Sequence, residues 1–297
     1  MEIIQASCTS NFRPYIHPPA RRQSSRYHTG IHVLSWPSPC SISPVQSKIP
    51  TYSKPISTTR AILDSSTSDS VATKTVEHNP SLAIKKKAFE VSTDLKGTSI
   101  FLVGINNSYK SNLGRMLADE FRYYYFDSDS LVEEAAGGKE AAISLLEEDE
   151  EGYLASETEV LKQLSSMGRL IVCAGNGAVN DATNLALLRH GISIWIDVPL
   201  DLVARDVLED RVQLSAYDMH VCGSSSEVPA QLATLYSSAR SGYSTADATI
   251  SFLKVASQLG YDELDAVTTE DLCIEVLKEI EKLVRVKKMM EDAARPF

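Results

Sequence analysis

One short stretch of the chain carries residues suited to phosphate chemistry: Gly104-Ile-Asn-Asn-Ser-Tyr-Lys110-Ser111. It follows an apolar, β-branched run and precedes a helical pattern. The phosphate-loop pattern is G-x-x-x-x-G-K-[ST], in which backbone N–H groups and a helix N-terminus cradle the phosphates. In a working loop, Lys110 would reach the β- and γ-phosphates and the Ser111 hydroxyl would hold Mg²⁺. Gly104, Lys110 and Ser111 match this pattern, and Tyr109 stands where the second glycine belongs.

The tyrosine at position 109 weakens the prediction of a phosphate loop. A glycine there permits backbone geometry that a bulky residue resists, at a cost of about 1–3 kcal/mol. The phenol would also occupy space near the phosphates. An ordinary strand-to-helix turn with a chance Lys-Ser pair is the alternative interpretation, and the loop alone does not decide between the two.

The elements that must position this loop alternate between strand and helix patterns. Five apolar segments predict strands, at 98–103, 123–126, 170–174, 192–198 and 248–252. Helical spacing is found at 83–95, 111–121, 129–136, 141–167 (with a break near Gly152), 182–189, 200–208 and 269–294. Such alternation predicts an α/β fold, with a parallel sheet covered by helices on both faces.

Several motifs in this order resemble the shikimate kinase family, over residues from about 85 to about 280. The family loop G-x-x-G-x-G-K-[ST] falls at 104–111, and F-x-D-x-D-x-x-I-E falls at 125–133 as Tyr-Phe-Asp-Ser-Asp-Ser-Leu-Val-Glu. Later landmarks are Gly175-Asn-Gly177, Arg211-x-x-Leu214 and Arg240-Ser-Gly-Tyr243. The resemblance implies a P-loop NTPase fold of the nucleoside-monophosphate-kinase type, with a five-stranded parallel sheet. It also implies ATP- and Mg²⁺-dependent phosphorylation of shikimate.

The resemblance assigns a role to each matching residue. It implies nucleotide binding by Gly104, Lys110, Ser111 and Arg211, and Mg²⁺ binding by Ser111 and Asp127. It implies that the substrate pocket contains Asp129, Gly175, Gly177 and Arg240. For Asp129, capping of the following helix is the alternative interpretation.

The departures from the family pattern fall on the chemistry. The arginine that clamps the shikimate carboxylate is Leu154 here, a loss that typically costs about 2–5 kcal/mol of binding. Loop glycines are replaced by Asn107 and Tyr109, and the middle glycine of the third-strand turn by Asn176. We therefore assign no catalytic residue. We predict that binding of ATP and Mg²⁺ is weakened and that the chain does not phosphorylate shikimate. This combination resembles a plant shikimate-kinase-like group, plastid proteins regarded as inactive relatives with a role in chloroplast biogenesis.

Two enzyme hypotheses compete with this interpretation. One is a working kinase for another small molecule, which would use Lys110, Ser111, Asp127 and Arg211 and a substrate without a carboxylate. The other is a residual shikimate kinase, which the three separate losses disfavour.

The N-terminal part has the composition of a targeting segment. Residues 1–60 contain 11 Ser, 5 Thr, 8 Pro and 7 basic residues but only one acidic residue, which is typical of a chloroplast transit peptide. Residues 61–82 are rich in Ser and Thr and predict a disordered linker. Residues 83–297 then form the shikimate-kinase-like domain, expected in the plastid stroma.

Charge and composition narrow the partner classes. Residues 61–297 carry a net charge of −16, and no basic patch is evident after Lys87, so nucleic acid is disfavoured as a partner. No apolar run approaches the roughly 18 residues of a transmembrane helix. The five cysteines lack metal spacing and predict free thiols. The expected partner is an unidentified protein or small molecule in the plastid.

Overall fold

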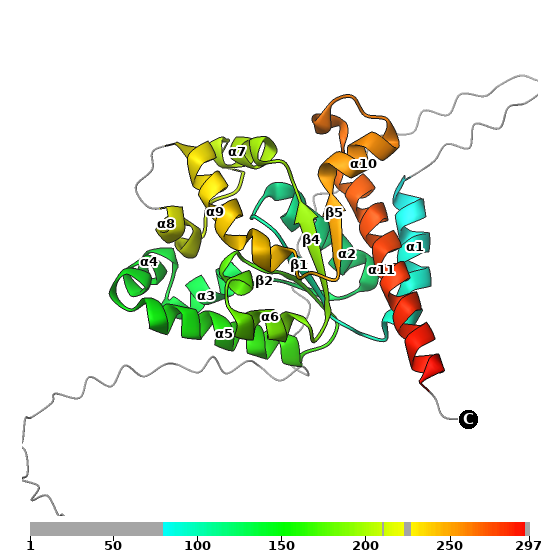
Figure 1. Cartoon of the computed structure of the whole chain (residues 1–297), viewed down its shortest axis with the longest axis horizontal. Helices are drawn as coiled ribbons and strands as arrows, with labels where there is room; N and C mark the ends of the chain where they lie inside the picture. Colours follow the sequence, from blue (N-terminus) through cyan, green and yellow to red (C-terminus); the bar gives the residue numbers. More distant parts are fainter. Residues whose placement is uncertain (1–79, 210, 223–226, 295–297) are drawn as a thin grey trace, which may run out of the picture. The chain divides into compact units, whose positions relative to one another are not determined.

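A computed structural model gives the fold and describes residues 80–209, 211–222 and 227–294 (Figure 1). The predicted transit peptide (1–60) and most of the predicted linker (61–82) lie outside the described residues. The first helix, α1 (Pro80–Leu95), begins three residues before the position expected from the sequence. Among the described residues, no helix has the length and apolar content needed to cross a bilayer.

Five parallel strands form one sheet in the order β2-β3-β1-β4-β5. The strands are β1 (Ile100–Val103), β2 (Tyr124–Asp127), β3 (Leu170–Cys173), β4 (Ile192–Asp197) and β5 (Ala248–Ser251). Every side chain of β1 and β3 is buried, as expected for central strands of a parallel sheet covered on both faces. This confirms the predicted fold class, and it brings the carboxyl ends of β2, β3 and β1 to one edge.

The helices cover the sheet and connect its strands (Figure 1). Helices α1, α2 and α11 pack against one another, and α5 packs against α6 and the turn η1. The remaining bounds are α2 (Ser108–Phe121), α3 (Ser128–Ala136), α4 (Lys139–Glu148), α5 (Glu150–Ser166), η1 (Gly177–Val179), α6 (Ala182–Leu188), α7 (Leu200–Leu208), α8 (Ala216–Cys222), α9 (Val228–Tyr243), α10 (Phe252–Leu259), η2 (Leu264–Ala266) and α11 (Thr269–Ala293).

The structure differs from the sequence expectations in three places. Helix α2 begins at Ser108, three residues before the expected start at Ser111. The long acidic helix breaks at Asp149, not at Gly152, because the Asp149 carboxylate accepts the Gly152 N–H and starts α5. Helices α8, α9 and α10 had no counterpart in the sequence prediction.

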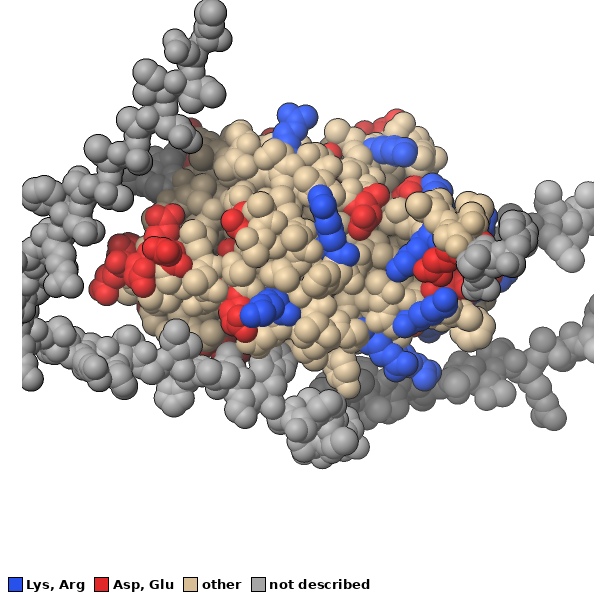
Figure 2. Space-filling model, turned by 60° about the horizontal axis from the view of Figure 1, so that its bottom comes forward, with Lys and Arg blue, Asp and Glu red and all other residues tan. Residues whose placement is uncertain are grey.

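Charge is distributed unevenly over the surface. Figure 2 shows acidic side chains gathered at one end of the visible face and Lys and Arg side chains near the other. The expectation of no basic cluster after Lys87 was wrong, because α11 exposes Lys282, Arg285, Lys287 and Lys288. Three of these four form ion pairs: Lys282 with Glu279, Arg285 with Glu281, and Lys288 with Asp94. Acidic neighbours thus offset part of this positive charge.

Candidate functional site

The candidate residues of the first three strands meet at one edge of the sheet. Gly104 follows β1, Asp127 ends β2, and Gly175 lies just after β3. Because these strands are neighbours, their carboxyl ends place the loop 104–111 beside Asp127 and Asp129. One direct link is the Asn106 amide, which donates to the Asp129 carboxylate at 2.7 Å. The loop and the acids that follow β2 thus form one contiguous region.

The ammonium group of Lys110 points into the protein. Its side chain has 0% of its surface exposed. The Nζ atom donates three hydrogen bonds, to the Gly104 carbonyl (2.7 Å), the Asn106 side-chain oxygen (2.6 Å) and the Ala174 carbonyl (2.9 Å). An ammonium group has three protons, so its donors are all used. Lys110 therefore joins the loop to the end of β3 and does not face a ligand.

Side-chain oxygens of the protein accept hydrogen bonds from the donors of the loop. Asn107 is buried and caps α2, because its Oδ1 accepts the Lys110 N–H at 2.8 Å. The next residue, Ser108, donates both its N–H (2.8 Å) and its hydroxyl (2.6 Å) to the Asp206 carboxylate. The N–H is a backbone donor of the kind that would bind phosphate in a working loop.

The loop carries no backbone strain at the two substituted glycine positions. Asn107 is extended (φ −156°, ψ 166°), and Tyr109 is not among the positive-φ residues. The expected strain at Tyr109 was wrong, because the early start of α2 gives this residue an ordinary helical backbone. Its ring packs edge-on against Phe252 of α10, with centroids 5.0 Å apart. In this loop the glycine at 104, with φ 130°, is the one that needs positive φ.

Three carboxyl groups are buried together behind the loop. Asp129, Glu157 and Asp218 have 6%, 2% and 0% of their surfaces exposed. Burial, together with the nearby carboxylates of Asp218 and Asp127, raises the pKa of Asp129 to about 7, against the opposing charge of Lys110. Burial, with Asp129 and Asp218 alongside, raises the pKa of Glu157 to about 8. The pKa of Asp218 is also raised by burial.

Asn176 joins the third-strand turn to α8. Its amide donates to Asp218 at 2.6 Å, and its carbonyl oxygen accepts the hydroxyl of Tyr243 from α9. All three side chains are buried. The residue that replaces a family glycine therefore joins this turn to both α8 and α9.

The flanking glycines are required by close approach. A Cβ at Gly175 would lie 1.7 Å from the Asp129 carboxylate, and one at Gly177 would lie 2.4 Å from Glu157. This turn is packed against the carboxyl cluster with no room for larger residues.

The buried carboxyl cluster should make stability fall with rising pH. Above pH about 4.5, folded Asp129 up to pH about 7 and folded Glu157 up to pH about 8 retain protons that the unfolded chain has lost. Since the folded state then binds more protons, its stability decreases as pH rises through this window. We expect the free energy of unfolding to drop by about 1–3 kcal/mol per pH unit, measured by urea denaturation.

A matched pair of α5 variants isolates this effect. Glu157→Gln should flatten the slope between pH 5 and 8, whereas Glu159→Gln, at an exposed position of the same helix, should leave it unchanged. A slope that is the same in both variants and in the wild type would contradict the assignment.

The remaining candidate residues lie at the margins of this region. Arg211 is exposed and pairs with Glu209 at 2.5 Å, and one of its nitrogens lies 3.7 Å from the Asp206 carboxylate. Arg240 is exposed on α9, with its guanidinium 5.9 Å from the centre of the Tyr236 ring. Leu154 is 37% exposed on α5. The structure thus does not bring Arg240 into contact with the buried carboxyl cluster.

The residues present do not fit a Mg²⁺–nucleotide complex. The Lys110 ammonium and the Ser108 donors already have protein partners, and Asp127 caps α3 by accepting the Ser130 N–H. Within the described ranges, no group of three or more His, Cys, Asp or Glu side chains is arranged to hold a metal ion.

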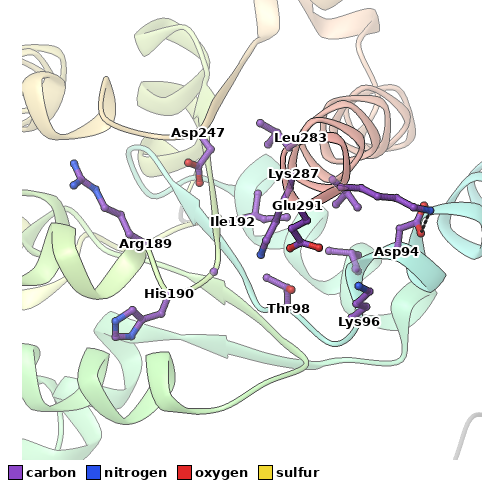
Figure 3. A pocket seen from close by; sticks show the side chains of 14 residues that line it. Asp94, Lys96, Thr98, Arg189, His190, Ile192, Asp247, Leu283, Lys287 and Glu291 are labelled. Carbon is purple, nitrogen blue, oxygen red and sulfur yellow. Dashed lines mark hydrogen bonds and ion pairs between the residues drawn. The ribbon is translucent and has the colours of Figure 1, made fainter. Parts of the chain in front are cut away.

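A cavity of about 280 Å³ lies at the opposite edge of the sheet (Figure 3). Its lining includes Thr98 before β1, Ile192 at the start of β4, Asp247 before β5 and Lys287 of α11. These positions are amino ends of strands, whereas ligands of open α/β sheets bind at the carboxyl ends. The cavity is therefore separate from the candidate site.

Sequence reasoning missed three residues of the site: Asn106, Asp206 and Asp218. Asn106 lies inside the loop motif, at a position that the pattern leaves open. Asp206 and Asp218 are separated from their partners by 98 and 42 residues. No local spacing indicates such contacts. The run of polar residues in the loop is consistent with side-chain hydrogen bonds but does not identify their partners.

Comparison with known proteins points to one family. A family model described as shikimate kinase matches residues 106–258. The chain is 54% identical over 242 residues to "Probable inactive shikimate kinase like 1, chloroplastic" of Arabidopsis thaliana, covering 82% of each chain. It is 36% identical over 208 residues to "Shikimate kinase 2, chloroplastic" of Oryza sativa subsp. japonica, covering 68% of this chain and 66% of the relative.

A solved structure agrees in fold. The shikimate kinase from Acinetobacter baumannii in complex with shikimate aligns with a TM-score of 0.52 and 24% identity, covering 65% of this chain and 97% of that one.

Proposed function

This chain belongs to the shikimate kinase family, and we propose that it is a non-catalytic plastid member of that family. The observation that carries the proposal is the position of Lys110, whose ammonium has three acceptors inside the protein. Phosphoryl transfer depends on positive groups placed around the transferred phosphate. A lysine bound in the interior supplies no such charge.

Two further features support the absence of shikimate phosphorylation. The position of the family's carboxylate clamp is Leu154, which offers no hydrogen bond to a carboxylate. The pocket beside Asp129 is filled by the chain's own Asp218 and Asn176, both with 1% or less of their surface exposed. A substrate would have to displace α8 before it reached Asp129.

We place the protein in the chloroplast, in the stroma, with a role in chloroplast biogenesis exerted through a protein or small-molecule partner. The acid-poor composition of residues 1–60 supports import into the plastid, and the curated relatives above are chloroplastic by name. The role in biogenesis rests on the resemblance to plastid relatives regarded as inactive.

The test combines an activity assay with genetic complementation. We expect no detectable ADP formation from ATP, Mg²⁺ and shikimate with the full chain, in an assay where a rice shikimate kinase turns over. In a plant line lacking the protein, Asp127→Asn should restore chloroplast development as well as the wild-type chain does. Asn caps a helix as well as Asp, so this variant should keep the fold while losing the one carboxylate expected at Mg²⁺.

Deletion of residues 1–60 serves as the control, because it should abolish complementation without altering the folded domain. Turnover of shikimate by the wild-type chain, or failure of Asp127→Asn to complement, would contradict a non-catalytic role.

A further inference from the structure

The Asp206 carboxylate binds the loop at the N-terminus of α2. Asp206 belongs to α7, 98 residues along the chain from the loop, and it is 2% exposed. Its Oδ2 atom accepts two hydrogen bonds from Ser108, one from the N–H (2.8 Å) and one from the hydroxyl (2.6 Å). Ser108 is the first residue of α2, so the carboxylate lies at the N-terminus of a helix of 14 residues.

This arrangement has the chemistry of a bound anion. A helix N-terminus carries partial positive charge and unpaired N–H groups, and it favours a negative group there. The second carboxylate oxygen, Oδ1, lies 3.7 Å from Arg211, the arginine that the family resemblance places on the nucleotide. Asp206 therefore engages both a backbone donor of the loop and the guanidinium expected to contact phosphate.

The buried Asp206 carboxylate leaves no room for a phosphate group at the same donors and would repel it. A phosphate oxygen at Ser108 would meet Asp206 within hydrogen-bond distance, with like charges in a region of low dielectric constant. The loss of the loop glycines does not by itself explain why a phosphate would be excluded, because Asn107 and Tyr109 adopt relaxed backbone conformations. Exclusion of the nucleotide thus has a second source outside the loop.

We propose that Asp206 is an internal ligand of the loop, which occupies the phosphate position and excludes nucleoside polyphosphates. The proposal deepens the non-catalytic function argued above and rests on it, because it names the group that closes the nucleotide half of the site. It also implies that an anion site remains beneath Asp206, built from the α2 N-terminus, Ser108 and Arg211.

Removal of the carboxylate should expose that site. The probe is inorganic pyrophosphate, which presents the anionic groups of a nucleotide without its base. We expect Asp206→Ala to bind pyrophosphate at least tenfold more tightly than the wild-type chain, measured by isothermal titration calorimetry. Its melting temperature should be lower than that of the wild type without pyrophosphate and should rise as pyrophosphate is added. The wild-type melting temperature should not respond.

A matched control and a second variant keep the test decisive. Asp201→Ala removes an exposed carboxylate from the first turn of the same helix and should show no gain in affinity. Asp206→Asn keeps the size of the side chain and an oxygen for Ser108 but removes its charge, so a smaller gain is expected. If Asp206→Ala does not fold, the comparison of Asp206→Asn with Asp201→Ala decides the question.

The outcomes separate this inference from the proposed function. Folded Asp206 variants that bind pyrophosphate no better than Asp201→Ala would overturn the internal-ligand proposal and leave the absence of kinase activity untouched. Shikimate phosphorylation by the wild-type chain would overturn the proposed function, whatever the pyrophosphate result. A role of Asp206 as a helix cap alone would lower the melting temperature in the variants but would not make it depend on pyrophosphate.

Discussion

Lys110→Met should lower the free energy of unfolding by about 3–5 kcal/mol, as is typical when one partner of a buried charged network is removed. The ammonium is buried and donates to two backbone carbonyls and one side-chain oxygen. Methionine fills a similar volume but leaves those oxygens without a donor. It also removes the positive charge that opposes the raised pKa of Asp129. Urea denaturation at pH 7 measures the change.

This result would distinguish a structural lysine from a ligand-binding one. A loop lysine that faces a ligand contributes little to the fold, so its removal would leave stability nearly unchanged. Lys162→Met is the matched control, since that side chain is 67% exposed on α5 and should alter stability by less than about 0.5 kcal/mol. Equal stability of the two variants would show that Lys110 is not bound in the interior.

Asn176→Gly should destabilise the fold by about 2–4 kcal/mol, although it restores the glycine expected from the family pattern. Asn176 donates to buried Asp218 and accepts the buried Tyr243 hydroxyl. Its removal leaves two buried oxygen atoms, Asp218 Oδ1 and the Tyr243 hydroxyl, without these partners, each at a cost of about 1–3 kcal/mol. We expect faster amide exchange in α8 as well, because the Asn176–Asp218 bond attaches this helix to the turn.

Two further variants test the reason for this effect. Asn180→Gly removes an amide that donates to the Tyr217 hydroxyl in an exposed position, and it should cost about 1 kcal/mol or less. Asn176→Asp preserves shape and the acceptor for Tyr243 but sets a carboxylate against Asp218, so its destabilisation should grow as pH rises. A fully stable Asn176→Gly variant would mean that a family-type glycine turn is still available to this chain.

Lys110 and Asn176 both serve the fold at positions of the family motifs. Lys110 keeps the residue type that the motif requires, but its ammonium now holds the loop to β3. Asn176 departs from the motif, and its side chain attaches α8 to the third-strand turn. Residue type at a motif position therefore does not determine whether a side chain serves a ligand or the fold.

Most of the fold could be predicted from the sequence. Apolar β-branched runs such as 98–103 and 170–174 predict buried strands, and their alternation with helical spacing specifies a parallel α/β sheet. These signals are local, because the side chains of one strand or helix lie within a few residues of each other. Helix ends were less well predicted, since capping by Asn107 and Asp149 depends on which side chain captures the free N–H groups.

The sequence by itself showed that Leu154 replaces the family's arginine and that Tyr109 and Asn176 replace glycines. It therefore predicted that the chain lacks shikimate kinase chemistry. Only the tertiary structure decided where the remaining polar groups went. The sheet order brings β1 beside β3, which gives the Lys110 ammonium the Ala174 carbonyl as an acceptor. The packing of α7 places Asp206 on Ser108 across 98 residues. Such contacts join residues that no local spacing relates, and they form because buried polar groups must find partners wherever the fold offers them.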